Sequence, residues 1–353
     1  MRNVVLFSGS FHPREGGAER QMKAVLSALK ADAYSVAVVT QAIPTGDVPR
    51  REVIDGIEVF RVGSRWMFGM VPRLGQVMFV AAAVWTGVRL RPRVAVSMQM
   101  GTASVAAALV ARLVGGRRIL RLTGGGTAKF RSEPMARAAT RGGRWLASVV
   151  CSGRFTVVAP ARHLIDDFEA SFPDKAERAL VIPNGVSVSG QAVSPVADVV
   201  WYSRAGSERS YEVFRDIAEL LPEVRFTVMG HLDRDDELPV NVSSIGWTDT
   251  PEAVIRSHRV ILNTSLNEGM PNTVLQAISG GVLAVGFENR GMLELGRDHA
   301  DFVVTVPYGD AVRAAQAIEV ALQREVPKVG ASVPSLEVVQ ARWKAELTRG
   351  SSE

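Results

Sequence analysis

The sequence contains a single cysteine, Cys151, among its 353 residues. One cysteine cannot form an internal disulfide, and this usage is typical of a reducing compartment. Because Cys151 lies in an apolar stretch, we interpret it as a buried structural thiol and not as a nucleophile. The uncharged apolar stretch at 74–88 has only fifteen residues, which is short for a membrane span. Residues 1–8 run straight into an expected strand, so no cleavable signal is expected.

Aromatic residues make up only 7% of the chain, and no nucleic-acid-binding motif is recognisable, so nucleic acid is not an expected partner. The five histidines show no metal-ligand spacing among themselves, and no Asp-x-Asp follows an expected strand of the first half. The acidic run at 233–237 follows an expected strand and is interpreted as a solvated loop. We therefore expect neither a metal nor another cofactor.

Acidic residues are scarce in the first half of the chain. Residues 1–183 contain 26 Lys and Arg against 13 Asp and Glu, whereas the remainder contains 15 against 23. Between residues 59 and 165 there are 17 basic residues and a single acid, Glu133. The asymmetry has two interpretations at this point: solubility in an Arg-rich proteome, or a basic face that meets an anionic surface or acceptor.

The length suits two domains of about 150–190 residues each. Hydrophobic residues account for 47% and charged residues for 22% of the chain, which is typical of a folded α/β protein. Strand and helix patterns alternate through both halves, which predicts parallel sheets covered on both faces. We predict two doubly wound Rossmann-like domains, 1–186 and 187–334, facing a central cleft, with a last helix at 335–349 packing back on the first.

The periodicity predicts strands in the first half at 4–9, 35–40, 57–62, 94–98, 118–123, 155–160 and 179–186. Strands in the second half are expected at 199–203, 225–230, 243–246, 259–265, 282–287 and 302–306. Helices are expected at 18–29, 73–90, 103–114, 134–147, 208–221, 251–257, 271–280 and 310–324.

The segment 267–277, NEGMPNTVLQA, carries the most specific chemistry. It follows the apolar run 259–265, which reads as a buried parallel strand and places Glu268 at its carboxyl end. Pro271 suits the first position of a helix, whose unpaired amides would face the same crevice as the Glu268 carboxylate. Amides for phosphate beside a carboxylate for hydroxyls predict a sugar-nucleotide site. Gln276 would lie near this crevice, about two helical turns further on.

Three further segments accompany this one, and together the four resemble a known family. They are Gly16-Gly17-Ala18-Glu19-Arg20, Ile182-Pro183-Asn184-Gly185-Val186, and Ser203-Arg204 to Arg209. In their order and spacing they are similar to the retaining GT-B glycosyltransferases of family four, which transfer a sugar from a nucleoside diphosphate sugar. The resemblance extends over nearly the whole chain and implies a metal-independent transferase with the two-domain GT-B fold.

The resemblance implies a role for each matching residue. Glu268, Arg204 and Arg209 match the family's catalytic groups: the acid holds donor-sugar hydroxyls, and the two cations meet the charge that builds up on the departing diphosphate. The donor-site residues implied by the match are Gly16 and Gly17 near the diphosphate, Gly269, Met270, Pro271 and Asn272 at the sugar or phosphate, and Thr273 and Val274 near the nucleoside.

Three positions depart from the family pattern, one of them Ser187, where the family often has Asp. Gln276 stands where a second Glu usually binds the ribose, and its amide can still exchange hydrogen bonds with the 2′ and 3′ hydroxyls. A histidine that many members carry is absent, and its segment instead contains Gly124 and Gly125, which could supply backbone contacts or form an inert turn. His12, in the first loop, is a candidate for acceptor contact.

The leading prediction is a retaining glycosyltransferase that uses a UDP- or GDP-linked sugar and an acceptor that is a lipid-linked or cell-surface glycan intermediate. The basic first half and the Arg-flanked apolar segment 65–93 favour a cytoplasmic protein in peripheral contact with an anionic membrane. A nucleotide-sugar epimerase and a non-catalytic nucleotide-sugar-binding subunit remain alternatives. An NAD-dependent dehydrogenase fits least, because the first loop lacks a tight Gly-x-Gly-x-x-Gly.

Overall fold

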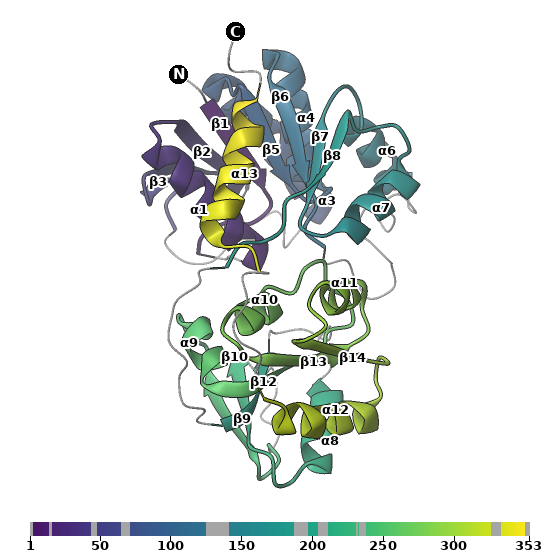
Figure 1. Ribbon diagram of the computed structural model, residues 1–353. Coiled ribbons are helices and arrows are strands. Elements are labelled where there is room, and N and C mark those ends of the chain that lie inside the picture. Colours follow the sequence, from purple (N-terminus) through teal and green to yellow (C-terminus); the bar gives the residue numbers. More distant parts are fainter. Residues whose placement is uncertain are drawn as a thin grey trace. The chain divides into compact units, whose positions relative to one another are not determined.

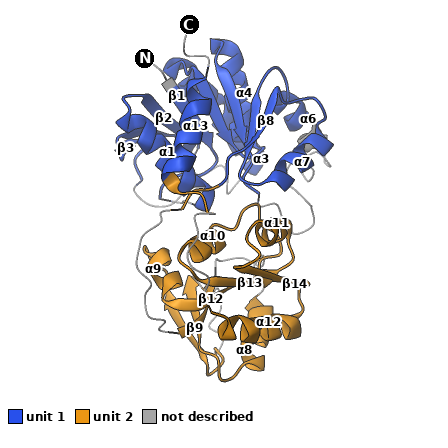
Figure 2. Cartoon of the chain, in the orientation of Figure 1, with its two compact units in different colours: residues 1–183, 337–353 blue, residues 184–336 orange. Residues whose placement is uncertain are grey.

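The computed structural model describes residues 3–13, 16–43, 48–64, 71–124, 141–186, 197–203, 211–230, 232, 238–325 and 333–349. The chain forms two compact units, residues 1–183 with 337–353 and residues 184–336 (Figure 2). The division falls between Pro183 and Asn184, close to the expected 186/187. Each unit is a parallel-sheet α/β structure with its own hydrophobic core (Figure 1).

Unit 1 contains an eight-stranded sheet in the order β3-β4-β2-β1-β5-β6-β7-β8. Its strands are β1 (Asn3–Ser8), β2 (Ser35–Gln41), β3 (Arg51–Ile54), β4 (Ile57–Val62), β5 (Val94–Met98), β6 (Arg117–Arg121), β7 (Thr156–Ala159) and β8 (Arg178–Val181). All neighbours pair in parallel except β3 and β4. Strand β1 is apolar on both sides because helices cover both faces of the sheet.

The helices of unit 1 are α1 (Gly17–Ala31), α3 (Pro72–Leu90), α4 (Thr102–Val114), α6 (Arg141–Val150), α7 (Arg162–Ser171) and α13 (Leu336–Thr348). Val4 and Leu6 of β1 point to a core that α1 and α13 complete on one face of the sheet. Val5 and Phe7 point to a second core under α3 and α4 on the opposite face. The alternation follows the two-residue period of a strand and confirms the predicted double covering.

Unit 2 contains a six-stranded, fully parallel sheet in the order β11-β10-β9-β12-β13-β14. The strands are β9 (Ala197–Ser203), β10 (Phe226–Gly230), β11 (Val242–Gly246), β12 (His258–Asn263), β13 (Leu283–Phe287) and β14 (Val303–Val306). The helices are α8 (Tyr211–Leu220), α9 (Pro251–Arg256), α10 (Asn272–Ser279), α11 (Arg290–Asp298) and α12 (Ala311–Gln323). Trp201 of β9 stacks on Phe214 of α8, with ring centroids 4.3 Å apart, at the centre of the core.

Among the described residues, three elements are present that the periodicity does not predict. Strand β3 is a short edge strand whose alternating charged residues hide the strand pattern, and it forms an antiparallel hairpin with β4. The turn between them holds Asp55 and Gly56 at φ values of 50° and 78°, as a two-residue hairpin turn requires. Helices α7 and α11 are the other two, and the latter contains two glycines, which disfavour a helix by propensity.

Helix α13 is fixed to unit 1 by a buried carboxylate. Glu346 is 6% exposed, and its two oxygens accept from Arg117 at 2.7 Å and Arg178 at 2.8 Å. Trp343, one turn earlier, is 1% exposed and lies under the guanidinium of Arg121. The last helix therefore joins the sheet of unit 1 by both burial and charge.

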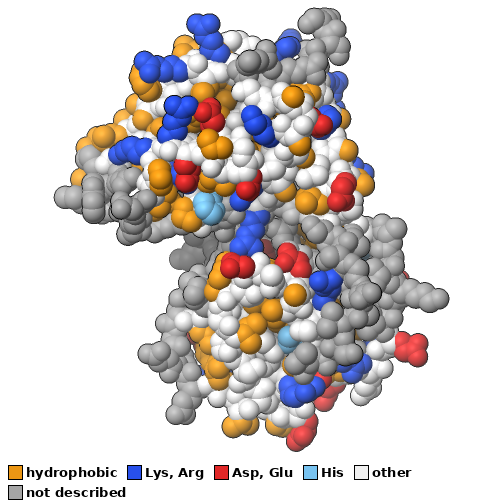
Figure 3. Space-filling model, turned by 90° about the vertical axis from the view of Figure 1, so that its left-hand side faces the viewer, with side chains coloured by type: hydrophobic (Ala, Val, Ile, Leu, Met, Phe, Trp, Pro, Cys, Tyr) orange, Lys and Arg blue, Asp and Glu red, His pale blue; other side chains and the backbone are white. Residues whose placement is uncertain are grey.

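In the parts of the chain that the structure describes, no helix has the length and apolarity needed to cross a membrane. Lys and Arg side chains are spread over the described surface of unit 1 in the view of Figure 3. This distribution agrees with the excess of basic residues in the first half of the sequence.

We expect Glu346→Ala to lower the free energy of unfolding by about 1–3 kcal/mol, because it leaves two guanidinium groups without their shared partner. The loss stays below that of a fully buried pair because Arg117 and Arg178 are 35% and 34% exposed and can be partly hydrated. Urea unfolding followed by circular dichroism measures the effect. Glu337→Ala, an exposed change on the same helix, is the control and should shift the value by less than about 0.5 kcal/mol. Equal effects of the two changes would contradict the role of Glu346.

Candidate functional site in unit 2

The sheet of unit 2 reverses its direction of growth between β9 and β12. From β9 the chain adds β10 and β11 on one side, and it then returns to place β12, β13 and β14 on the other. Crevices that bind ligands in such sheets lie beyond the carboxyl ends of the two strands at this switch point. The segment after β9 begins with Arg204, and the segment after β12 carries Glu268. Arg204 and Arg209 themselves lie outside the described residues.

Buried polar groups shape the segment that follows β12. The indole Nε1 of Trp201 donates to Thr264 Oγ1 at 2.8 Å, and the Ser265 amide donates to Asn263 Oδ1 at 3.0 Å. Asn289 caps α11 by accepting from the Met292 amide, and its own amide donates to the Ser265 carbonyl at 2.9 Å. Strand β12 therefore ends at Asn263, two residues earlier than predicted, because these contacts replace the hydrogen bonds between neighbouring strands.

Glu268 follows the end of β12 by five residues, and its side chain is half-buried. The first turn of α11 packs directly on its backbone: a Cβ at Gly291 would come within 2.7 Å of the Glu268 carbonyl oxygen and 3.1 Å of that of Gly269. Only glycine at position 291 allows this approach. The backbone that carries Glu268 is thus held between the loop after β12 and the start of α11.

Helix α10 begins at Asn272, one residue later than predicted, and Pro271 is its extended N-cap residue. The correction follows from the ψ of 99° at Pro271, which is outside the helical range. The amides of Asn272 and Thr273 have no acceptor within the helix, since the first turn of any helix lacks one. Asn184, only 4% exposed, donates to the Asn272 side-chain oxygen at 2.7 Å and so joins the Ile-Pro-Asn-Gly segment to this helix start.

The neighbours of Glu268 differ in what they could offer a ligand. Gly269 and Pro271 are buried, and Met270 and Thr273 are half-buried. Val274 is fully buried in the core of unit 2, so a contact from it to a ligand would come from its backbone. The first turn of α10 therefore offers backbone groups and the Thr273 hydroxyl to a ligand.

Gln276 contacts a carboxylate that the sequence did not associate with it. Its Nε2 donates to Glu252 Oε1 of α9 at 2.6 Å, and both side chains are half-buried. This hydrogen bond brings an acid from a segment 24 residues earlier next to the amide. Glu252 has no sequence signal of its own, because only the packing of α9 against α10 places it there.

In unit 1 the expected residues follow β1, at the switch point between β1 and β5. The Gly16 amide donates to Glu19 Oε2 at 2.9 Å, and the Ser10 hydroxyl donates to Glu19 Oε1 at 2.9 Å. Gly17 is the first residue of α1. The Glu19 carboxylate thus satisfies the Gly16 amide, so a diphosphate would have to replace that bond or use other backbone groups.

Two buried guanidinium groups hold the ends of this loop. Arg61, 2% exposed, donates to the His12 carbonyl at 2.6 Å and forms an ion pair with Glu52. Arg121, also 2% exposed, donates to the Ala18 carbonyl at 3.0 Å. Burial lowers the pKa of Arg121 to about 10, and the negative charge of Glu19 acts in the opposite direction. The sequence does not assign either arginine to the loop, since strand position alone does not predict burial of a cation.

The remaining candidates of unit 1 are His12 and the glycine run. The His12 side chain is exposed. Gly124 has a φ of 65°, the left-handed region that favours glycine, whereas Gly125 lies outside the described residues. The conformation of Gly124 fits either of the two roles expected of it, a ligand contact or a turn.

Among the described residues, neither a reactive thiol nor a metal-binding cluster is found. Burial raises the pKa of the Cys151 thiol to about 11, so the thiol is protonated at neutral pH. Among the described residues, no cluster of three His, Cys, Asp or Glu side chains could hold a metal ion. The acidic run 233–237 lies outside those residues.

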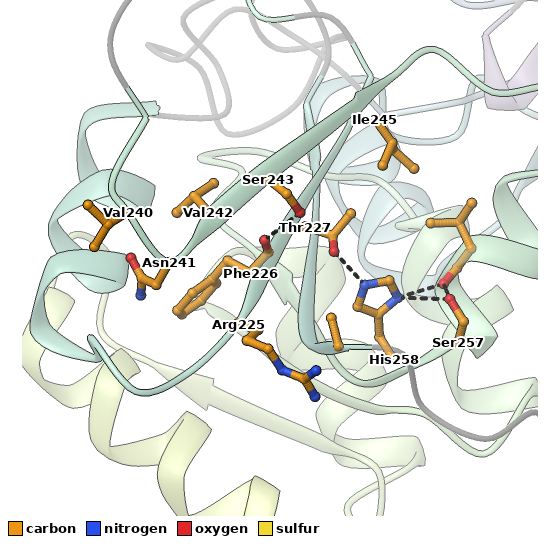
Figure 4. A pocket seen from close by; sticks show the side chains of 12 residues that line it. Arg225, Phe226, Thr227, Val240, Asn241, Val242, Ser243, Ile245, Ser257 and His258 are labelled. Atoms are coloured by element: carbon orange, nitrogen blue, oxygen red, sulfur yellow. Dashed lines mark hydrogen bonds between the residues drawn. The ribbon is translucent and has the colours of Figure 1, made fainter.

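In unit 2, a pocket of about 560 Å³ lies at the amino ends of the sheet strands, opposite the carboxyl ends where Glu268 follows β12 (Figure 4). It is lined by the residues that begin β9, β10 and β12, namely Ala197, Phe226 and His258. His258 Nε2 lies 2.8 Å from the Thr227 hydroxyl, and Nδ1 lies 2.7 Å from the Val254 carbonyl, so both ring nitrogens are engaged. This pocket is therefore distinct from the carboxyl-edge site around Glu268.

The fold is that of the GT-B glycosyltransferases. Sucrose-phosphate synthase from Thermosynechococcus elongatus superposes with a TM-score of 0.74 at 15% identity, over 99% of this chain and 98% of that one. Anabaena Alr3699/HepE in complex with UDP and glucose superposes with a TM-score of 0.73 at 16% identity, over 99% and 100%. A glycosyltransferase from Rickettsia africae gives 0.72 at 13% identity, over 99% of both chains.

Sequence comparison gives a second, independent result. Residues 197–324 match the family described as Glycosyl transferases group 1. The match covers the strands and helices of unit 2 from β9 to α12 and includes both segments at its switch point. It supports glycosyl transfer as the class of activity. A comparison of the chain with curated protein sequences finds no match.

We expect the free energy of unfolding to fall as the pH decreases below about 6.5. Burial lowers the pKa of His258, so its imidazole stays neutral in the folded state while the unfolded chain binds a proton in this range. The pKa of His299 is lowered in the same direction, again chiefly by burial. Each group can contribute no more than about 1.4 kcal/mol per pH unit.

Urea unfolding at pH 7.5 and 5.5 measures this difference in the wild type, His258→Gln and His299→Gln. In each variant, the free energy of unfolding should fall less between pH 7.5 and pH 5.5 than it does in the wild type, whatever the stability of the variant at pH 7.5. A fall of equal size in the wild type and in His258→Gln would show that this imidazole is not kept neutral by burial.

Proposed function

We propose that the chain is a retaining glycosyltransferase that moves a sugar from a UDP- or GDP-linked donor to an acceptor. The observation that carries the proposal is that the match to Glycosyl transferases group 1 spans both segments that follow β9 and β12 in the sequence, the first of which begins with Arg204 and the second of which contains Glu268. A related fold supports it, because Anabaena Alr3699/HepE has been solved in complex with UDP-glucose.

In the proposed reaction, Glu268 holds hydroxyls of the donor sugar while Arg204, Arg209 and the amides at the start of α10 stabilise the diphosphate. The bond between the anomeric carbon and the phosphate oxygen breaks, and the acceptor oxygen bonds to that carbon on the same face. The acceptor proton passes to the departing phosphate oxygen. This route uses no side chain as a general base and no metal ion, because cationic groups and amides meet the developing charge.

The acceptor that we propose is a lipid-linked or cell-surface glycan intermediate. The support for it is electrostatic: residues 1–183 carry a net charge of +13, and such intermediates carry phosphate groups or lie on anionic membranes. Unit 1 would then bind the acceptor and unit 2 the donor.

Glu268→Ala should weaken binding of the donor sugar by roughly 10–100-fold, the loss expected for one hydrogen bond to a charged group. Isothermal titration with a panel of UDP- and GDP-sugars identifies the donor, and the free nucleotide diphosphate should keep its affinity for this variant. Arg204→Met should weaken both ligands, because it removes a phosphate contact. Glu319→Ala and Arg313→Met, exposed changes on α12, are the matched controls.

Turnover separates the proposed reaction from its alternatives. With an acceptor present, proton NMR should show a product with the donor's anomeric configuration, and EDTA should not change the rate. Binding without turnover on any acceptor would favour a non-catalytic subunit, and a changed sugar without an acceptor would favour an epimerase. If no nucleotide sugar binds, or if Glu268→Ala and Arg204→Met leave affinity and turnover intact, the proposal fails.

We further propose that Gln276 and Glu252 together bind the ribose hydroxyls of the donor. Wild-type protein should then prefer the nucleotide to its 2′-deoxy form by about 10-fold, the value of one good hydrogen bond. Gln276→Ala and Glu252→Ala should each reduce this preference, whereas the exposed change Gln316→Ala should not. An unchanged preference in both variants would mean that the pair only joins α9 to α10.

A further inference from the structure

Helix α3 exposes apolar side chains although it lies at the surface of unit 1, and its only charged residues are Arg73 and Arg89. Its inner side packs Phe79 and Ala83 on the sheet. Its outer side exposes Leu74, Val77, Met78 and Trp85, with Val77 and Trp85 64% and 59% exposed. These four residues follow the spacing of one helical face. A surface helix of a globular protein normally has charged residues on this side, so the exposed face requires a partner.

The neighbouring helix also exposes apolar side chains. Helix α4 packs beside α3 on the same face of the sheet and exposes Leu109 and Leu113, the latter 67% exposed. We call these six side chains the α3–α4 surface; they are Leu74, Val77, Met78, Trp85, Leu109 and Leu113. They lie on the outside of the helical layer, because the opposite sides of both helices form the core over Val5 and Phe7.

On the helices that form and adjoin the α3–α4 surface, the charges have one sign. Neither α3 nor α4, nor α6, which packs beside α4, contains an Asp or Glu. Arg73, Arg89 and Arg112 border the apolar side chains, and all three are exposed. The guanidinium of Arg89 lies 3.5 Å from the ring centroid of Trp85. An aromatic ring with a cation beside it suits the boundary between apolar chains and charged headgroups.

The absence of acids on these helices decides between the classes of occupant. A contact surface between proteins has a polar rim around an apolar centre, whereas the charged groups that border the α3–α4 surface are all basic, which is complementary to an anionic bilayer. Residues 184–336, which form unit 2, contain 12 Lys and Arg against 20 Asp and Glu, a net charge of −8, so an anionic surface would repel unit 2 and attract unit 1. The charge distribution of the chain therefore favours approach to a membrane through unit 1.

We propose that the α3–α4 surface docks on an anionic lipid bilayer. Leu74, Val77, Met78 and Trp85 enter the boundary between headgroups and acyl chains, while Arg73, Arg89 and Arg112 pair with lipid phosphates. The inference deepens the proposed function, because it gives the means by which a transferase with a lipid-linked acceptor meets its substrate. The docking itself can be tested without any sugar substrate.

The test is flotation of the full chain with vesicles of phosphatidylcholine alone and of phosphatidylcholine with about one-third phosphatidylglycerol. Wild-type protein should float with the anionic vesicles in 50 mM salt and much less in 500 mM salt, because salt screens the headgroup charge. Val77→Ser with Trp85→Ser should abolish flotation. Arg73→Gln and Arg89→Gln should each weaken it about fivefold, which corresponds to about 1 kcal/mol per basic residue.

The matched control is Val312→Ser with Val320→Ser on α12 of unit 2, two valines that are 55% and 60% exposed. This variant should float like the wild type. All the changes are at exposed positions. Circular dichroism checks that each variant is folded, and nucleotide-sugar titration checks separately that it keeps its donor site. Loss of flotation with intact donor binding would thus separate the docking surface from the proposed reaction.

Three results would overturn the proposal. The first is no association of the wild type with anionic vesicles in low salt. The second is association that the serine and glutamine changes on α3 leave unaltered. The third is self-association, seen by light scattering without vesicles and removed by Val77→Ser with Trp85→Ser, which would make a second copy of the chain the occupant.

Discussion

The pairing of β9 with β12 is the interaction on which the candidate site depends. The two strands align Val199 with Val260 and Trp201 with Leu262 in parallel register, so their carboxyl ends lie side by side. Between them in the sequence, β10 and β11 are placed on the far side of β9, and the chain must return across the sheet. That return leaves two adjacent strand ends whose following segments diverge, which makes room for a ligand. The hydrogen bond from Trp201 to Thr264 ties the two ends together.

Polar groups with low exposure position the loops on both units. In unit 2, Asn184, Asn263 and Asn289 hold the segment after β12 and the start of α10 through side-chain amides. In unit 1, Arg61 and Arg121 perform the same task with guanidinium groups that donate to loop carbonyls. With a pKa of about 10, Arg121 remains charged at neutral pH despite its burial. Burying a cation carries a desolvation cost, so these arginines serve to fix loop geometry more than to stabilise the fold.

The sequence predicted most elements of the fold, because a parallel sheet covered on both faces leaves a strong apolar signature in each strand. Its errors have local causes. The periodicity does not predict strand β3, because an edge strand tolerates charged residues. It predicts Pro271 as the first residue of α10, whereas Pro271 precedes that helix as its N-cap residue. The candidate site likewise contains residues that the sequence singles out and contacts that it does not. Glu268 could be singled out as an acid after an apolar strand, but the link from Gln276 to Glu252 could not, because it joins two helices that no sequence spacing relates.

The sequence by itself determined the order of the elements, the division into two units, the basic excess of the first half and the residue types that follow each strand. These depend on local periodicity and composition, which the chain carries at every position. Only the tertiary structure decided which acid lies beside Gln276, which arginines are buried under the first loop, and which apolar side chains of α3 face outward. The reason is physical. The periodicity of apolar residues predicts where a helix or strand forms and which residues share a face, whereas burial and hydrogen-bond partners depend on groups brought together from distant parts of the chain.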